Sequence, residues 1–222
     1  MVKPSIEPKQ GSQADANARQ RILEAARSAF IRHGYHGARM QDIADDAGIN
    51  KALLHYYFQS KENLFDLVFQ DAFSEFLPRL HAILASKDPV IDKIEAYLGA
   101  HLQLLQSRPD LPLFVLNEVY RNPERFFTKF MHHLQGASPF SVLLEQIAEE
   151  MEAGILRPMN PRELWFNVMS MVVFPVIARP ILQKISATPD REYEAILEQR
   201  QQSLLLFIRN AIVLPERPAV NP

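Results

Sequence analysis

Side chains of the types that contact nucleic acid gather on both sides of Gly48. Helical spacing predicts that they face outward: Arg39, Gln41, Asn50, Lys51, Leu53, His55 and Tyr56. Lys and Arg neutralise phosphate, while amide, imidazole and phenol groups bond to phosphate, sugar or base edges. Leu53 can neither donate nor accept, so a thymine methyl is its natural partner at a base edge. These residue types favour contact with a DNA backbone, with Lys51 as the strongest candidate.

Two short predicted helices joined at Gly48 must position these side chains. Their remaining residues are apolar and spaced to bond the two helices together: Ile43, Ala44, Ala47, Ile49, Leu54 and Phe58. A helix-turn-helix has these dimensions, and its second helix fits a major groove about 12 Å wide. A left-handed turn suits Gly48. Any helical hairpin shares this spacing, so spacing alone leaves a purely structural hairpin open.

Residues for catalysis or metal binding do not assemble in the sequence. His132 and His133 are adjacent, so on a helix they point about 100° apart, which is poor geometry for a shared metal. There is no Glu-x-x-His pair, no glycine-rich phosphate loop and no Gly-x-Ser-x-Gly. The absence of cysteine excludes thiolate metal sites and cysteine nucleophiles. We therefore expect a protein that is not an enzyme and has no cofactor or metal.

Charge is distributed unevenly along the 222 residues. Residues 1–63 carry nine Lys or Arg and seven Asp or Glu, or +2, whereas the whole chain has a net charge of −2. A mildly basic head on an acidic body is compatible with nucleic acid touching the head alone. The longest apolar stretch, 164–178, has 15 residues, and a membrane span needs about 20. No apolar targeting segment opens the sequence, so we expect a cytoplasmic location and no membrane partner.

An all-α fold is predicted, because the seven glycines are scattered and no segment alternates as a strand does. Five prolines follow a residue that can cap a helix and so mark helix starts: Asp88-Pro89, Asn122-Pro123, Ser138-Pro139, Asn160-Pro161 and Thr188-Pro189. Predicted helices span about 17–33, 40–47, 51–58, 60–85 with a kink or break at Pro78, 89–107, 111–121, 123–135, 139–153, 161–185 and 189–213. Residues 1–16 are expected as a flexible arm and 214–222 as a frayed tail.

The segment 17–69 closely resembles the DNA-binding head of the TetR (tetracycline repressor) family of transcriptional regulators. The resemblance rests on Ile-Leu-x-Ala-Ala-x-x-x-Phe from Ile22, Gly34-Tyr35-x-Gly37, Asp42-Ile43-Ala44-x-x-Ala47-Gly48-Ile49 and Tyr57-Phe58-x-Ser60-Lys61-x-x-Leu64-Phe65. It implies a helix-turn-helix domain over 17–62 and a larger helical domain for ligand binding and dimerisation over 63–213. It also implies a ligand-responsive regulator, usually a repressor, that binds double-stranded operator DNA of inverted-repeat symmetry as a homodimer.

On this resemblance, 51–57 corresponds to the recognition helix, and Lys61 joins the predicted DNA contacts. Where the family often has Gly, Thr and Tyr, this chain has Ala52, Leu53 and His55, so base specificity does not carry over. Tyr57 and Phe58 are interpreted as core wedges. The alternative is a helical ligand-binding or interaction protein whose head does not bind DNA.

The last two predicted helices, 161–185 and 189–213, are apolar around much of their circumference and must be covered on several sides. The resemblance makes them the dimer interface, for which we predict Val172, Val176, Ile181, Leu204, Phe207 and Ile208. A purely intramolecular core is the alternative.

Aromatic and methionine side chains concentrate between Phe114 and Phe174, as in an apolar cavity. With polar groups nearby, they predict a site for a partly apolar small-molecule effector: His101, Phe114, Asn117, Glu118, Arg121, Phe127, Phe130, Met131, Trp165 and Met169. Ordinary core packing is the competing interpretation for each of them.

Overall fold

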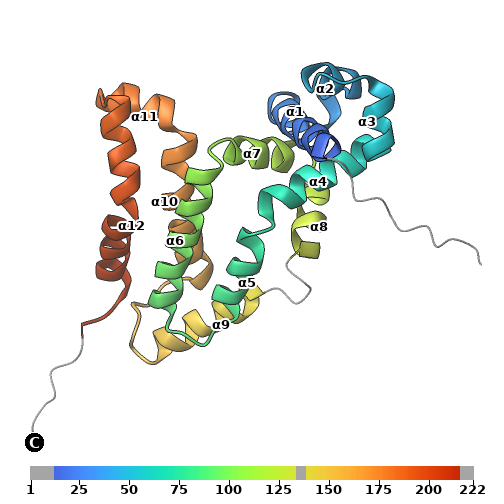
Figure 1. The fold of residues 1–222 in the computed structure, drawn as a ribbon. Helices are drawn as coiled ribbons and strands as arrows, with labels where there is room; N and C mark the ends of the chain where they lie inside the picture. Colours follow the sequence, from blue (N-terminus) through green and yellow to red (C-terminus); the bar gives the residue numbers. More distant parts are fainter. Residues whose placement is uncertain (1–12, 134–138, 216–222) are drawn as a thin grey trace, which may run out of the picture. The chain divides into compact units, whose positions relative to one another are not determined.

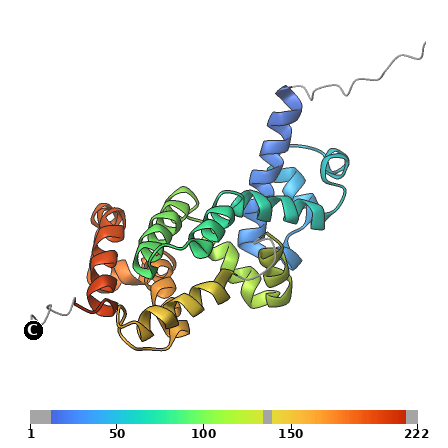
Figure 2. The same cartoon turned by 90° about the horizontal axis from the view of Figure 1, so that it is seen from below.

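The computed structural model describes residues 13–133 and 139–215, which form helices and connecting turns (Figure 1, Figure 2). Their twelve helices are α1 (Gln13–Gly37), α2 (Met40–Asp46), α3 (Lys51–Phe58), α4 (Lys61–Phe73), α5 (Phe76–Ala85), α6 (Val90–Ser107), α7 (Leu111–Arg121), α8 (Pro123–His133), α9 (Pro139–Glu152), α10 (Pro161–Ile177), α11 (Arg179–Ser186) and α12 (Asp190–Ile212). The all-α prediction is confirmed.

The chain divides into two compact units between Ala72 and Phe73, ten residues after the predicted boundary at 62. Helix α1 begins at Gln13, so the predicted helix start at Asn17 is wrong by four residues. The remainder of the predicted arm, and the predicted tail from residue 216 onward, lie outside the described residues.

The first unit is built around one apolar face of α1. Its side chains at i, i+4, i+7 and i+8 are all buried, as predicted: Ile22, Ala26, Ala29 and Phe30. The ring of Phe30 meets that of Phe65 on α4 edge-on, with centroids 5.0 Å apart. The regular helix stops at Gly34, whose φ of 66° and ψ of 176° are not helical, as expected of a glycine that ends a helix.

The turn between α2 and α3 has the left-handed conformation predicted for Gly48, with φ of 66°. The Gly48 N–H donates to the carbonyl oxygen of Asp45 at 3.1 Å, and the Ile49 N–H donates to that of Ala44 at 3.0 Å. These bonds satisfy carbonyls at the end of α2. The two helices are then locked by apolar side chains that are buried on their facing sides: Ile43, Ala44, Ala47, Leu54 and Phe58.

Prolines define the helix boundaries of the second unit. Helices α8, α9 and α10 begin at Pro123, Pro139 and Pro161, as predicted, while Pro89 and Pro189 precede α6 and α12 by one residue. At the start of α10 the Asn160 side chain accepts a hydrogen bond from the Arg162 N–H at 2.9 Å. The predicted helix 60–85 is two helices, and its break lies at 74–75, ahead of Pro78. Pro78 is the third residue of α5, where no intrahelical N–H is needed.

The predicted helix 161–185 is also two helices, α10 and α11, which meet at 77°. Pro175 has no N–H, so the Met171 carbonyl four residues earlier lacks its helical partner. Arg200 on α12 supplies the missing donors, since its Nη2 and Nε lie 2.6 Å and 3.2 Å from that oxygen. The break in α10 is thus stabilised by a side chain that periodicity within 161–185 does not reveal.

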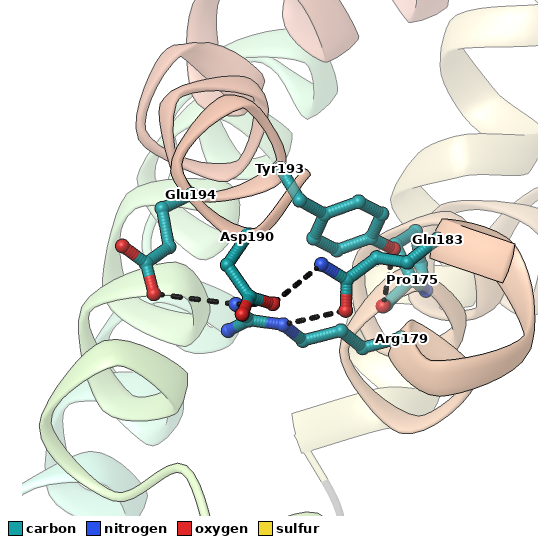
Figure 3. A network of polar contacts seen from close by, with 6 residues as sticks. All are labelled: Pro175, Arg179, Gln183, Asp190, Tyr193 and Glu194. Atoms are coloured by element: carbon teal, nitrogen blue, oxygen red, sulfur yellow. Dashed lines mark hydrogen bonds and ion pairs between the residues drawn. The ribbon is translucent and has the colours of Figure 1, made fainter. Parts of the chain in front are cut away.

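A cluster of polar contacts, shown in Figure 3, holds the start of α12 against the α10–α11 bend. The Tyr193 hydroxyl donates to the Pro175 carbonyl at 2.8 Å. Arg179 forms an ion pair with Glu194 at 3.2 Å and donates to Gln183. A hydrogen bond from Gln183, reinforced by Arg179, holds the pKa of Asp190 below its ordinary value. We call these contacts the α12 clasp.

The other end of α12 pairs with the loop that precedes α10. Leu156 and Val213 form an isolated antiparallel bridge. The Arg157 N–H donates to the Ile212 carbonyl at 2.7 Å, and the Leu214 N–H donates to the Ile155 carbonyl at 3.0 Å. This pairing fixes the chain just beyond α12.

None of the described helices is by itself long and apolar enough to cross a membrane; the bent pair α10 and α11 passes the test of length and composition only when the two are taken together.

Candidate nucleic-acid interface and ligand cavity

Helix α3 presents one polar surface outward and buries the opposite one. Lys51, His55 and Tyr56 are exposed, with Tyr56 at 78 %, while Leu54 and Phe58 are buried against the rest of the first unit. Lys51 is the first residue of α3, so its ammonium adds to the positive end of the helix dipole. The N–H groups at the start of α3 and the Lys51 ammonium can therefore donate hydrogen bonds to phosphate oxygens.

Two further predicted contacts lie at the start of α2. Arg39 is the residue before the first turn and is exposed. Gln41 is exposed as well, and its amide donates to the Asp45 carboxylate one turn later at 2.8 Å. The Arg39 carbonyl accepts from the Ile43 N–H, but its side chain makes no hydrogen bond or ion pair with the described residues, so the guanidinium is available to phosphate.

Three of the predicted DNA contacts occupy positions in which they stabilise the fold. The Asn50 side chain accepts from the Leu53 N–H at 2.7 Å and caps α3, so its oxygen is engaged. Leu53 is half-buried rather than fully outward. The Lys61 ammonium donates to the His36 carbonyl at 3.2 Å and lies 4.7 Å from the centroid of the Tyr35 ring. It therefore joins α4 to the end of α1.

A further tie orients α3, and the sequence pattern did not predict it. The Tyr57 hydroxyl donates to the Asp15 carboxylate of α1 at 2.8 Å, and this bond raises the pKa of Tyr57 above its ordinary value. Asp15 lies in the segment that was expected to be a flexible arm. Arg19, one turn later, lies over the Phe58 ring at 6.0 Å. The first turns of α1 thus help to fix the angle of α3.

The second unit encloses a cavity of about 570 Å³, within the range of small-molecule sites. Its walls come mainly from α5, α6, α7, α8 and α10, and Phe73 at the end of α4 and Phe140 in α9 also line it. No lining residue among those described is charged. The only tryptophan of the chain, Trp165, lines the cavity, with its ring 4.7 Å from that of Tyr97 and 5.4 Å from that of Phe140.

Four of the ten predicted ligand residues line this cavity: His101, Phe130, Trp165 and Met169. The other six are outside the lining: Phe114, Asn117, Glu118, Arg121, Phe127 and Met131. Phe114 and Glu118 are buried elsewhere, and Arg121 and Phe127 are exposed, the latter at 63 %. Periodicity placed these residues on helices without showing which face of α7 or α8 meets the cavity.

The sequence prediction missed Tyr97 and Phe76, which precede the aromatic-rich segment. Tyr97 lines the cavity and pairs with His101, whose Nδ1 lies 2.7 Å from the hydroxyl. Burial lowers the pKa of His101 to about 4, so the imidazole is neutral near pH 7. Burial also raises the pKa of Tyr97. A tyrosine one helical turn before a histidine on an apolar helix was the available signal.

The predicted dimer residues divide between core and surface. Val172, Leu204 and Ile208 are buried within the single chain, where they fill the core of the second unit. Val176 is half-buried. Ile181 and Phe207 are exposed at 59 % and 61 %. Other large apolar side chains exposed on α10 to α12 are Phe166, Met169, Phe174, Ile185, Ile196 and Leu206.

Metal-dependent chemistry has no candidate site among residues 13–133 and 139–215, which contain no group of three or more His, Asp or Glu side chains able to hold an ion. What the first unit does present is a short exposed helix after a glycine turn, with basic and hydrogen-bonding groups outward. These features define a DNA-binding protein of the helix-turn-helix class.

Comparison with known proteins agrees with this class. The family described as bacterial regulatory proteins, tetR family, matches residues 22–68. The HTH-type transcriptional regulator RutR of Escherichia coli K12 is 28 % identical over 201 residues, which cover 89 % of this chain and 93 % of that protein. The HTH-type transcriptional repressor SCO4008 of Streptomyces coelicolor is 26 % identical over 166 residues, covering 74 % of this chain and 81 % of that protein.

Among solved structures, the ketosteroid transcriptional regulator KstR2 of Mycobacterium tuberculosis has the same fold. It aligns with a TM-score of 0.68 at 18 % identity, covering 93 % of this chain and 98 % of that one. Residues 22–68 thus match the tetR family of bacterial regulatory proteins, and most of the chain is similar to helix-turn-helix transcriptional regulators.

Proposed function

We propose that this regulator is a repressor that binds an inverted-repeat operator as a homodimer and leaves it when an effector fills the cavity of the second unit. The observation that carries the DNA-binding part is the exposed edge of α3, where Lys51, His55 and Tyr56 stand clear of the core. Such a regulator acts in the cytoplasm, where bacterial DNA lies.

Symmetry supports the dimer. One helix of eight residues reads few base pairs, whereas two such helices related by a twofold axis read two half-sites on one face of the duplex. The exposed apolar side chains of α10 to α12 are a surface of the kind that a second copy covers. Phe207 and Ile181 remain candidates for that interface.

The effector part follows from linkage. A ligand that lowers operator affinity by some factor must itself bind more weakly, by the same factor, when the operator is bound. Ligand binding and DNA binding can therefore be measured separately and then together on one preparation.

The operator test uses the purified full chain and DNA from upstream of its own gene, protected against nuclease cleavage. We expect a protected inverted repeat that survives excess competitor DNA, with affinity falling steeply as salt rises. Protection lost equally to any competitor DNA would refute specific regulation. No DNA binding at low salt would favour the alternative, a helical ligand-binding or interaction protein.

The dimer test introduces one charge on α12. Phe207→Glu is expected to convert the dimer into a folded monomer in sedimentation velocity, because a carboxylate cannot enter an apolar interface unpaired. Gln202→Glu is the matched control, since it adds the same charge at an exposed position about 140° around the helix. A Phe207→Glu dimer as tight as wild type would remove this surface from the interface.

A further inference from the structure

The lining of the cavity in the second unit offers more hydrogen-bond donors than acceptors, and this excess indicates the kind of ligand that would fit. The polar side chains in its described lining are Tyr97, His101, Trp165 and Ser170. The Ser170 hydroxyl donates to the Asn167 carbonyl of its own helix at 3.0 Å, so its proton is used. Among the described residues, the side chains of Tyr97, His101 and Trp165 make one hydrogen bond, which joins Tyr97 to His101.

Counting protons shows the excess. A neutral imidazole has one N–H and a tyrosine has one O–H, and the single contact between Nδ1 of His101 and the Tyr97 hydroxyl uses one of them. Whichever tautomer forms, one donor and one acceptor of the pair are left over, so the excess donor of the lining comes from Trp165. The indole N–H of Trp165 makes no hydrogen bond with the described residues, and an indole can only donate.

The same lining disfavours a ligand that carries a charge. The cavity wall has no Lys, Arg, Asp or Glu among its described residues, and the half-buried His101 side chain is neutral near pH 7. A carboxylate or ammonium group placed there would lose its hydration without gaining an ion pair. A neutral oxygen acceptor instead satisfies a donor that is otherwise unpaired in an apolar wall.

We propose that the effector is an uncharged, largely apolar molecule with a hydrogen-bond acceptor, such as a ketone, that bonds to the Tyr97–His101 pair or to Trp165. This inference rests on the proposed effector role of the cavity, and it adds the chemical class. It separates this site from one built for acids or amines, in which a paired opposite charge lines the wall.

The test uses four probes of one shape with the wild-type chain at pH 7.5: 4-butylacetophenone, butylbenzene, 4-butylbenzoate and 4-butylbenzylammonium. Binding is followed by calorimetry and by emission of the single tryptophan, Trp165, which lines the cavity. We expect the ketone to bind about 5- to 10-fold more tightly than butylbenzene. Both ions should bind at least about 100-fold more weakly than the ketone.

A double variant, Tyr97→Phe with His101→Leu, removes both donors of the pair and keeps an apolar wall. The ratio of the butylbenzene and ketone dissociation constants should then fall toward one. The wild-type probe series decides the matter even where this variant does not fold. A carboxylate that binds within about tenfold of the ketone overturns the inference, as does failure of all four probes to bind.

Tight binding of the carboxylate, or no binding by any probe, would refute the proposed ligand class and would leave the proposed DNA binding untouched. Operator protection is measured without any probe, so it stands or falls separately. Release of the operator by the ketone but not by the benzoate would support both proposals together.

Discussion

Replacing Arg200 by Met tests whether this side chain supplies the donors that Pro175 withholds from α10. The Met side chain keeps an apolar stem of similar reach but removes the guanidinium, so the Met171 carbonyl is left without a donor. Replacing Pro175 by Ala restores a backbone N–H that can donate to the same carbonyl. The two substitutions therefore act on one oxygen atom, and their effects should not add.

The magnitude follows from the bonds involved. A hydrogen bond to a charged group contributes about 1.5–3 kcal/mol, and the Arg200 guanidinium makes two contacts with one half-buried carbonyl. Arg200→Met should therefore lower the free energy of unfolding by about 2 kcal/mol in the wild-type chain. With Ala at 175, the restored N–H satisfies the carbonyl, and the same change should cost about 0.5–1 kcal/mol. The expected coupling is about 1–1.5 kcal/mol.

Equilibrium unfolding in urea, followed by Trp165 emission, measures the four corners of this cycle in the unit that contains α10. Arg191→Met is the matched control, since Arg191 is exposed on α12, and its loss should change stability by less than about 0.5 kcal/mol in either background. Additive effects of the Arg200 and Pro175 substitutions, within about 0.3 kcal/mol, would refute the reasoning.

Three further predictions concern the two units. Lys51→Ala should weaken binding to duplex DNA and reduce the salt slope of the dimer by about 2, one phosphate per protomer, whereas Lys87→Ala, exposed in the second unit, should leave both unchanged in anisotropy titrations. Gly48→Ala and Gly154→Ala should each cost about 1–2 kcal/mol in thermal unfolding, because both have φ near +70° and no close neighbour. Only Gly48→Ala should also lower DNA affinity. His101 has a pKa of about 4 in the folded chain and about 6.5 in the unfolded chain, so protonation favours the unfolded state. The free energy of unfolding should therefore fall by up to about 3 kcal/mol as pH drops from 6.5 to 4. His101→Leu should abolish this part of the pH dependence, and a His101→Leu variant with the pH profile of the wild type would contradict the prediction.

The sequence predicted the first unit well because its signals are local. A glycine that needs a positive φ, as Gly48 does, and an apolar face at a spacing of three and four residues both act within one or two turns of chain. Pairings across α1, by contrast, depend on how helices meet. Periodicity cannot show that Tyr57 reaches Asp15 or that the Lys61 ammonium turns back to the His36 carbonyl.

The cavity was predicted only in part for a related reason. Aromatic content located the region, and Trp165 and Phe130 do line the cavity. Composition does not say which face of an amphipathic helix meets core, cavity or solvent, and Phe127, three residues before Phe130, is exposed. The predicted interface residues show the same limit of periodicity. Ile208 is buried within the single chain, whereas its neighbour Phe207 is exposed.

The α12 clasp holds the start of α12 to the α10–α11 bend, and the Leu156–Val213 bridge holds its other end to the loop that precedes α10. Arg200 adds a third point between them. With its ends and middle secured, α12 is unable to slide along α10 without breaking several hydrogen bonds at once. We therefore expect a shift of α10 at the cavity wall to move α12 with it, together with the apolar surface that the two helices carry.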